Sequence, residues 1–153
     1  MSLRQYFHIG IIVPDLVAAR ARFTELLGSE WGPVLDYEIE VRDADGHEAV
    51  LPNRMCYSTQ PPHIELIVES PGTPWVCNEH SNIHHIGFFS GTLGTDSGRL
   101  DAAGCPLEIM GGHGTGRPDG WAYHRDLLGV RVELVDEALR VPMEEYLFRP
   151  PSD

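Results

Sequence analysis

Two histidines and two glutamates recur in the same order in the two halves of the chain. His8 and His85 each begin a His-Ile-Gly motif, and Glu65 and Glu133 each lie in a short run of aliphatic residues. A carboxylate in the middle of an apolar strand is costly to bury unless it is paired. One shared cation would explain all four side chains, because imidazole nitrogens and carboxylate oxygens are ligands for divalent metals. We therefore predict one divalent ion per chain (zinc, nickel, cobalt, manganese or iron), held by His8, Glu65, His85 and Glu133.

The sequence around these residues repeats one succession of elements. A predicted strand over residues 6–13 is followed by a helix that Asp15 caps and Gly28 ends, because the apolar positions between them fall on one helical face. Apolar runs and turn signals then predict three strands, followed by a second strand–helix–three-strand succession. The predicted ranges after the first helix are 33–41, 48–57, 63–69, 83–89, 93–103 (helix), 106–111, 120–125 and 130–136.

This succession predicts a single domain of 153 residues that contains two copies of a βαβββ module. Module one takes about residues 5–70, a linker about residues 71–81, and module two about residues 82–138. The C-terminal tail, residues 139–153, is expected to form a short helix or to cover a sheet edge.

Strand geometry would bring the four polar side chains to one face. Successive side chains alternate across a strand, so His8 shares a face with Gly10 and Ile12 while the bulkier aliphatic residues take the other. We expect the bulky face to pack under the helices and the polar face to line the concave side of a curved sheet. A single strand histidine is usually a hydrogen-bonded structural residue, and a single strand glutamate usually faces solvent. Their recurrence in register favours the metal site instead.

Composition excludes several classes of function. The net charge is −12 and the chain has no Lys, so neither a nucleic acid nor an anionic membrane is an expected partner. The absence of Lys also rules out Schiff-base and P-loop chemistry. The three cysteines form no CxxC pair, which is typical of reduced thiols, and no secretory signal precedes the first strand. The expected location is therefore the cytoplasm.

Four segments of the chain resemble the vicinal oxygen chelate superfamily, which includes glyoxalase I, methylmalonyl-CoA epimerase, bleomycin resistance proteins and extradiol dioxygenases. The segments are FHIGIIVPDLVAARARFTELLG, PHIELIVES, IHHIGFF and GVRVELVDEAL. The resemblance is strongest to the glyoxalase-like and epimerase-like branch. It implies an α+β fold in which the two tandem βαβββ modules form a U-shaped, partly open eight-stranded mixed-sheet barrel around a metal. It also implies a homodimer.

The resemblance places the metal ligands at His8, Glu65, His85 and Glu133, and leaves His84 as a packed or supporting residue. Epimerase relatives commonly carry Gln at the position of Glu65, whereas glyoxalase I carries Glu. The implied function is that of a divalent-metal-dependent glyoxalase-like enzyme. It would catalyse proton transfer next to a carbonyl, as an epimerase, isomerase or lyase, on a small carbonyl or thioester substrate. Glu133 is the implied base.

Three further points remain open at this stage. The resemblance implies a second acid–base residue for which Glu48 is the nearest match, although an exposed hairpin glutamate is the other interpretation of that residue. An iron-dependent dioxygenase of the same fold is one alternative function. A non-catalytic protein that binds a small molecule or drug and confers resistance is the other.

Overall fold

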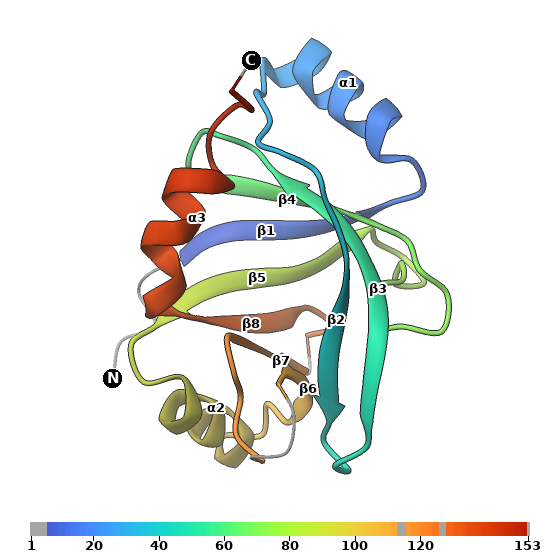
Figure 1. The fold of residues 1–153 in the computed structure, drawn as a ribbon. Coiled ribbons are helices and arrows are strands. Elements are labelled where there is room, and N and C mark those ends of the chain that lie inside the picture. Colours follow the sequence, from blue (N-terminus) through green and yellow to red (C-terminus); the bar gives the residue numbers. More distant parts are fainter. Residues whose placement is uncertain (1–5, 113–115, 126–127, 153) are drawn as a thin grey trace.

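The computed structural model describes residues 6–112, 116–125 and 128–152, and within them the two βαβββ modules follow one another as predicted (Figure 1). The first module contains β1 (Tyr6–Val13), α1 (Leu16–Leu27), β2 (Leu35–Asp43), β3 (Glu48–Tyr57) and β4 (His63–Val68). The second contains β5 (Ile83–Ser90), α2 (Leu93–Ala102), β6 (Leu107–Gly111), β7 (Trp121–Arg125) and β8 (Arg131–Asp136).

The ends of α1 follow from local chemistry. The Asp15 carboxylate accepts a hydrogen bond from the Ala18 backbone N–H at 2.9 Å, which satisfies a donor that the first turn leaves without a helical partner. Gly28 ends the helix with φ of 66°, in the left-handed region that other residues adopt only at a cost. Both predicted helix ends are therefore confirmed.

The eight strands form one closed barrel in the order β1-β4-β3-β2-β6-β7-β8-β5. β1 and β4 pair in parallel, as do β5 and β8, and the antiparallel β1–β5 pair joins the two modules. The predicted α+β mixed-sheet barrel is thus confirmed. The ring closes where a partly open sheet was expected. β2 continues past residue 41 to Asp43, and its last three residues pair with Gly111, Met110 and Ile109 of β6.

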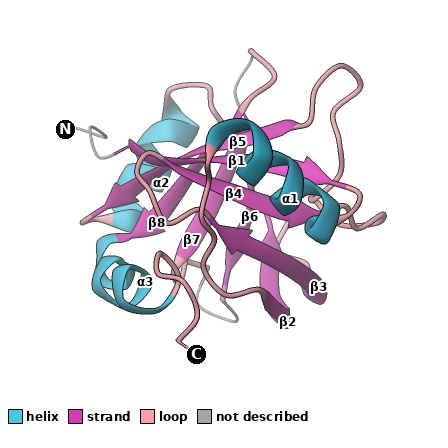
Figure 2. Ribbon diagram, turned by 90° about the horizontal axis from the view of Figure 1, so that it is seen from above, coloured by secondary structure: helices cyan, strands magenta, loops and turns pink. Residues whose placement is uncertain are grey.

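The helices lie outside the barrel (Figure 2). Leu16 of α1 packs with Leu66 and Cys56 on the outer face of the sheet, whereas Glu65, one residue away from Leu66, points inward. In β4, the predicted alternation between an outward aliphatic residue and an inward glutamate is therefore observed. No helix among the described residues is long and apolar enough to cross a membrane.

The C-terminal tail forms the short 3₁₀ helix η1 (Glu137–Leu139) and then α3 (Arg140–Tyr146). Figure 1 shows α3 across the ends of β1, β5 and β8, at one mouth of the barrel. Met143 and Phe148 are both buried in the core, which anchors the tail. The expectation of a short helix is met, and this helix closes a mouth of the barrel.

Candidate metal centre

His8, Glu65, His85 and Glu133 converge inside the barrel, all four of them buried. The Nε2 atoms of His8 and His85 lie 2.7 Å apart. Glu65 Oε2 lies 3.4 Å from His8 Nε2 and 3.0 Å from His85 Nε2. Glu133 Oε2 lies 3.0 Å and 3.3 Å from the same two nitrogens. The sequence therefore identified four side chains that meet at one point.

These separations suit a common cation. Ligand atoms about 2.0–2.2 Å from one ion lie about 3 Å apart at right angles and about 3.4 Å apart in a tetrahedron. The contacts between nitrogen and oxygen fall within that range. Both Oε2 atoms are buried and accept no properly directed hydrogen bond, despite lying this close to the imidazole nitrogens. A shared central ion would produce this arrangement, because all four side chains would point at the ion and not at one another.

Two glycines make this convergence possible. In the β1–β5 pair, Gly10 lies opposite His85 and Gly87 lies opposite His8. A Cβ atom on Gly10 would lie 2.0 Å from the His85 ring, and one on Gly87 would lie 1.9 Å from the His8 ring. Each His-Ile-Gly motif therefore supplies one of the converging histidines and the space for the histidine of the other module.

Strand register places the two carboxylates symmetrically about the histidines. Glu65 on β4 is the neighbour of Gly10 in the parallel β1–β4 pair. Glu133 on β8 is the neighbour of Gly87 in the parallel β5–β8 pair. The sheet thus carries one row that runs from Glu65 through Gly10 to His85, and a second row that runs from His8 through Gly87 to Glu133.

His84 orients the imidazole of His85, as the predicted supporting role requires. His84 Nε2 lies 2.8 Å from the Pro74 carbonyl oxygen, so this nitrogen carries the proton. The unprotonated Nδ1 of His84 then accepts a hydrogen bond of 2.9 Å from His85 Nδ1. That bond leaves the lone pair of His85 on Nε2, which faces the glutamates. Burial, followed by the charge of His85, lowers the pKa of His84 to about 4 and keeps it neutral.

The electrostatics of the group call for positive charge at its centre. Burial alone would lower the pKa of His85, but Glu133 and Glu65 outweigh it and raise the pKa to about 9. The pKa of His8 is raised against burial by the same two carboxylates. Burial opposes ionisation of Glu65 and Glu133, yet the close approach and charge of the two histidines outweigh it and hold both pKa values below the usual range. The two buried carboxylates thus favour positive charge on the imidazoles, and a divalent cation can supply that charge instead.

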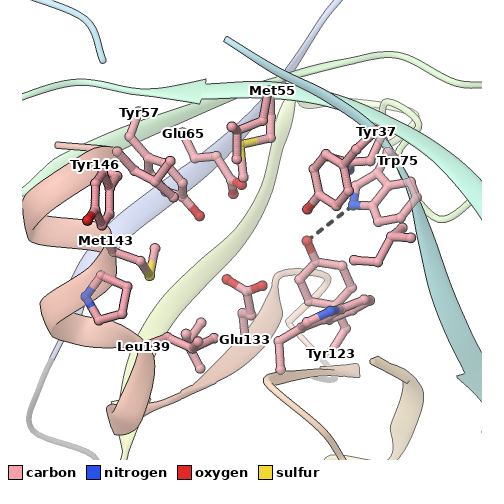
Figure 3. A pocket seen from close by; sticks show the side chains of 17 residues that line it. Tyr37, Met55, Tyr57, Glu65, Trp75, Tyr123, Glu133, Leu139, Met143 and Tyr146 are labelled. Carbon is pink, nitrogen blue, oxygen red and sulfur yellow. Dashed lines mark hydrogen bonds between the residues drawn. The ribbon is translucent and has the colours of Figure 1, made fainter. Parts of the chain in front are cut away.

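A cavity of about 340 Å³ opens above the group (Figure 3). The carboxylates of Glu65 and Glu133 face each other in this cavity. His8 and His85 are wholly buried and do not line it. The remaining walls are mainly aromatic and aliphatic, and η1 and α3 supply one side. The other lining residues are Leu35, Tyr37, Ile39, Asn53, Met55, Tyr57, Trp75, Trp121, Tyr123, Val135, Leu139, Pro142, Met143, Tyr146 and Leu147.

Two tyrosines of the site were missed by sequence reasoning. Tyr57 pairs with Glu65 across β3 and β4, and Tyr123 pairs with Glu133 across β7 and β8. Burial raises the pKa of both phenols well above the ordinary value, and the carboxylates add to the rise. The Tyr123 hydroxyl also accepts a hydrogen bond of 3.2 Å from the Trp75 indole N–H. The signal for these residues was cross-strand register, which depends on hairpin length.

Glu48 is not brought to this site. It begins β3 on the face opposite to Asn53, Met55 and Tyr57, which all line the cavity. Its side chain is exposed and lies 3.9 Å from the Arg42 guanidinium. Strand alternation therefore turns Glu48 outward, and the acid–base role predicted for it has no support from the geometry.

Comparison with known proteins gives a family and a fold. Residues 7–123 match the family model described as the Glyoxalase/Bleomycin resistance protein/Dioxygenase superfamily. A comparison with curated proteins returned no match.

Solved structures extend the likeness along the chain. Methylmalonyl-CoA epimerase from Mycobacterium tuberculosis is 20% identical with a TM-score of 0.59, covering 90% of this chain and 91% of its own. A hypothetical protein from Bacillus halodurans is 16% identical with a TM-score of 0.58, covering 87% and 94%. A halotolerant catechol dioxygenase is 19% identical with a TM-score of 0.52, covering 86% of this chain and 39% of its own. At these identities the likeness is one of fold.

Proposed function

The chain belongs to the glyoxalase/bleomycin resistance protein/dioxygenase superfamily, and we propose that it is a divalent-metal-dependent enzyme that moves a proton next to a carbonyl group. One observation carries the proposal: two histidines and two glutamates converge on one point at the floor of a cavity, with only the glutamates open to it. An epimerase, isomerase or lyase acting on a small carbonyl compound fits this arrangement.

His8, His85, Glu65 and Glu133 would hold the ion. A divalent ion bound there would supply Lewis-acid stabilisation of the negative charge that develops on a substrate oxygen. The two imidazoles are fully buried and packed, so they hold fixed positions below the cavity floor. His84 fixes the tautomer of His85 through the hydrogen bond between their Nδ1 atoms.

Glu133 is the proposed base. Its carboxylate faces the cavity and is not held by a directed hydrogen bond at Oε2, so it can turn toward a substrate C–H. Glu65 occupies the matching position in the other module, and the two carboxylates lie on opposite sides of the centre. One glutamate can thus remove a proton from one face of a substrate carbon, and the other glutamate can donate a proton to the opposite face.

The mainly aromatic and aliphatic walls of the cavity favour this chemistry by lowering the local polarity. Aromatic side chains from β2, β3 and β7, together with α3, surround the two carboxylates (Figure 3). Electrostatic interactions at a site shielded in this way are stronger than in water.

Two alternatives make different predictions. An iron-dependent dioxygenase would need ferrous iron and would consume oxygen, and two carboxylates beside two imidazoles leave less room for a catechol and dioxygen together. A drug-binding protein that works without metal would not need the four-residue group. Oxygen uptake that depends on iron would support the first alternative, and metal-free ligand binding that survives loss of His8 and His85 would support the second.

Exchange of substrate protons with deuterium tests the proposal. The metal-loaded protein is incubated in heavy water with α-hydroxyketones, 2-keto acids and acyl-CoA thioesters, and α-proton loss is followed by nuclear magnetic resonance. We expect exchange in at least one class, abolished by a chelator. Glu133→Gln should lower the exchange rate about 100-fold or more, because it removes the base.

Glu65→Gln is the matched control, since it changes the equivalent carboxylate of the other module. Its effect on exchange should be smaller at equal metal content. Absence of exchange in every class by the metal-loaded protein would contradict the proposed function, and full activity of Glu133→Gln would contradict the assignment of the base.

A further inference from the structure

We infer that the ligand of this centre is a small molecule that is uncharged when bound, mainly apolar, and oriented by the Asn53 amide. The inference rests on the proposed function, because it concerns the same cavity and names the class of substrate that the cavity selects.

The four proposed metal ligands carry a charge that matches one divalent ion. Two ionised glutamates cancel the charge of one divalent ion, and two neutral imidazoles add nothing to it. The centre thus has no net charge with which to attract an anion. A carboxylate or phosphate bound there would leave one uncompensated negative charge in a buried site, which is costly.

Apart from the two glutamates, the described residues that line the cavity are uncharged. No Arg lines it among the residues that the structure describes, and the whole chain has no Lys. Arg54 and Arg42 lie on the neighbouring strands β3 and β2, but at positions that alternate with the inward-facing residues. Arg54 lies 3.6 Å from the Asp36 carboxylate on the outside of the barrel. An anionic ligand would therefore meet aromatic rings and two glutamates where it needs a cation.

Arg131 on the second module and Arg140 on the tail also interact with groups outside the cavity. The Arg131 guanidinium pairs with the Glu108 carboxylate at 2.6 Å. Arg140 lies over the Phe89 ring, 4.1 Å from its centroid, outside the cavity. The electrostatic environment thus disfavours an anion from every wall formed by described residues.

The size of the cavity favours a compact ligand. A volume of about 340 Å³ is at the low end of the range of about 300–1,000 Å³ that is typical of small-molecule sites. η1 and α3 limit the cavity on one side through Leu139, Met143 and Tyr146. A compact molecule with one ring or a short aliphatic chain suits this space, whereas a nucleotide-bearing thioester would have to keep its phosphates outside.

Asn53 provides the polar contact for such a ligand. Its side chain is buried and lines the cavity, yet Oδ1 has no hydrogen-bond partner among the described residues. A buried amide oxygen without a partner is costly, and a ligand donor would remove that cost. Asn53 lies opposite Tyr37 in the β2–β3 pair, so an amide and a phenol border the same part of the cavity. Both groups are uncharged.

A matched pair of probes tests the inference. Mandelamide and mandelate share a phenyl ring, a hydroxyl and a neighbouring carbonyl oxygen, and they differ in charge. Binding to the zinc-loaded protein is followed by the fluorescence of Trp75 and Trp121, which line the cavity. We expect mandelamide to bind about tenfold more tightly or better, although a carboxylate is the stronger metal ligand in water. Equal or tighter binding of mandelate, or no binding of either compound, would overturn the inference.

Two variants test the two parts of the argument. Glu65→Gln leaves the zinc centre with one net positive charge, so the preference for mandelamide should shrink or reverse at saturating zinc. An unchanged ratio would overturn the charge argument. Asn53→Leu should weaken mandelamide binding without changing zinc content, whereas Arg54→Gln, on the outer face of the same strand, should do neither. Equal binding by Asn53→Leu and the unmodified protein would remove Asn53 from the recognition of the ligand.

Failure of this inference can be told apart from failure of the proposed function. Zinc content is measured on the same samples, and the titrations do not require turnover. Bound zinc with a preference for mandelate would contradict only the inference. A preference for mandelamide in zinc-loaded protein that shows no proton exchange would contradict only the proposed function.

Discussion

At the scale of single residues, the glycines of the two His-Ile-Gly motifs are as important for the convergence of the four side chains as the histidines. We predict that Gly10→Ala or Gly87→Ala lowers metal affinity about tenfold or more, because the new methyl group would occupy the place of His85 or His8. Overpacking of this kind also costs about 1–3 kcal/mol of stability. Metal titration and thermal unfolding measure the two effects.

Gly91→Ala is the matched control for these glycine variants. A Cβ at Gly91 meets no atom within 4 Å, so both metal affinity and stability should stay near those of the unmodified protein. Unchanged metal affinity in Gly10→Ala and Gly87→Ala would contradict the role given to the glycines.

The sequence predicted the four converging side chains because they recur in two modules, each with its strand and its aliphatic neighbours. Tyr57, Tyr123 and Asn53 could not be found in this way. Their place at the site depends on which residues face each other across hairpins, and hairpin register is not encoded in a local pattern. Glu48 shows the same limit from the other side, since its sequence match did not reveal which face of β3 it occupies.

At the scale of elements, an interior glycine lowers the stability of α2. Gly98 lies in the interior of this helix, and a Cβ there meets no atom within 4 Å. We predict that Gly98→Ala stabilises the protein by about 1 kcal/mol, since glycine costs about that much relative to alanine inside a helix. The unfolding midpoint should rise by about 2–4 °C in a chain of this size.

Gly28→Ala tests whether the backbone conformation, rather than the space available for a methyl group, decides the effect of a substitution. A Cβ at Gly28 would also meet no atom within 4 Å, but the φ of 66° at this position disfavours alanine. This variant should lose stability while Gly98→Ala gains it. A fall in the unfolding midpoint for Gly98→Ala would show that α2 depends on that glycine.

Element order was predictable, and element ends were less so. The start of α1 at Leu16 follows from capping by Asp15, whereas α2 starts at Leu93 without a side-chain cap. The continuation of β2 to Asp43 was missed: its final residues pair both with β3 of the same hairpin and with β6, a strand of the other module. That same long-range pairing closes the barrel, so a sequence-based expectation of a partly open sheet could not include it. The tail's position at the barrel mouth likewise depends on the burial of Met143 and Phe148.

At the scale of the whole molecule, the buried group should make stability depend on pH. The pKa of His85 is about 9 in the folded protein and about 6.5 when unfolded, so its proton stabilises the metal-free fold fully below pH 6.5. That contribution, on the order of 3 kcal/mol, is lost as pH rises from about 6.5 through 9. Denaturant unfolding of chelator-treated protein across this range measures the loss.

The metal-loaded protein should behave in the opposite way. The ion binds the unprotonated imidazoles, so metal binding becomes tighter as pH rises through the same range. A metal-free protein whose unfolding free energy stays level or rises between pH 6.5 and 9 would contradict the proton-holding role of the two glutamates.

Assembly of the molecule remains a prediction from the resemblance. We expect a homodimer in solution, and light scattering coupled to size exclusion measures it directly. A mass of one chain across the accessible concentration range would contradict this expectation.

Metal stoichiometry tests the central claim most directly. The purified protein is stripped, reloaded separately with zinc, nickel, cobalt, manganese or iron, desalted and analysed for bound metal per chain. We predict about one ion per chain for at least one of these metals, loss of that ion in His8→Ala and His85→Ala, and retention in His47→Ala. His47 is exposed and belongs to a separate group with Asp43 and Asp45. No binding by the unmodified protein, or undiminished binding by His8→Ala and His85→Ala, would contradict the account.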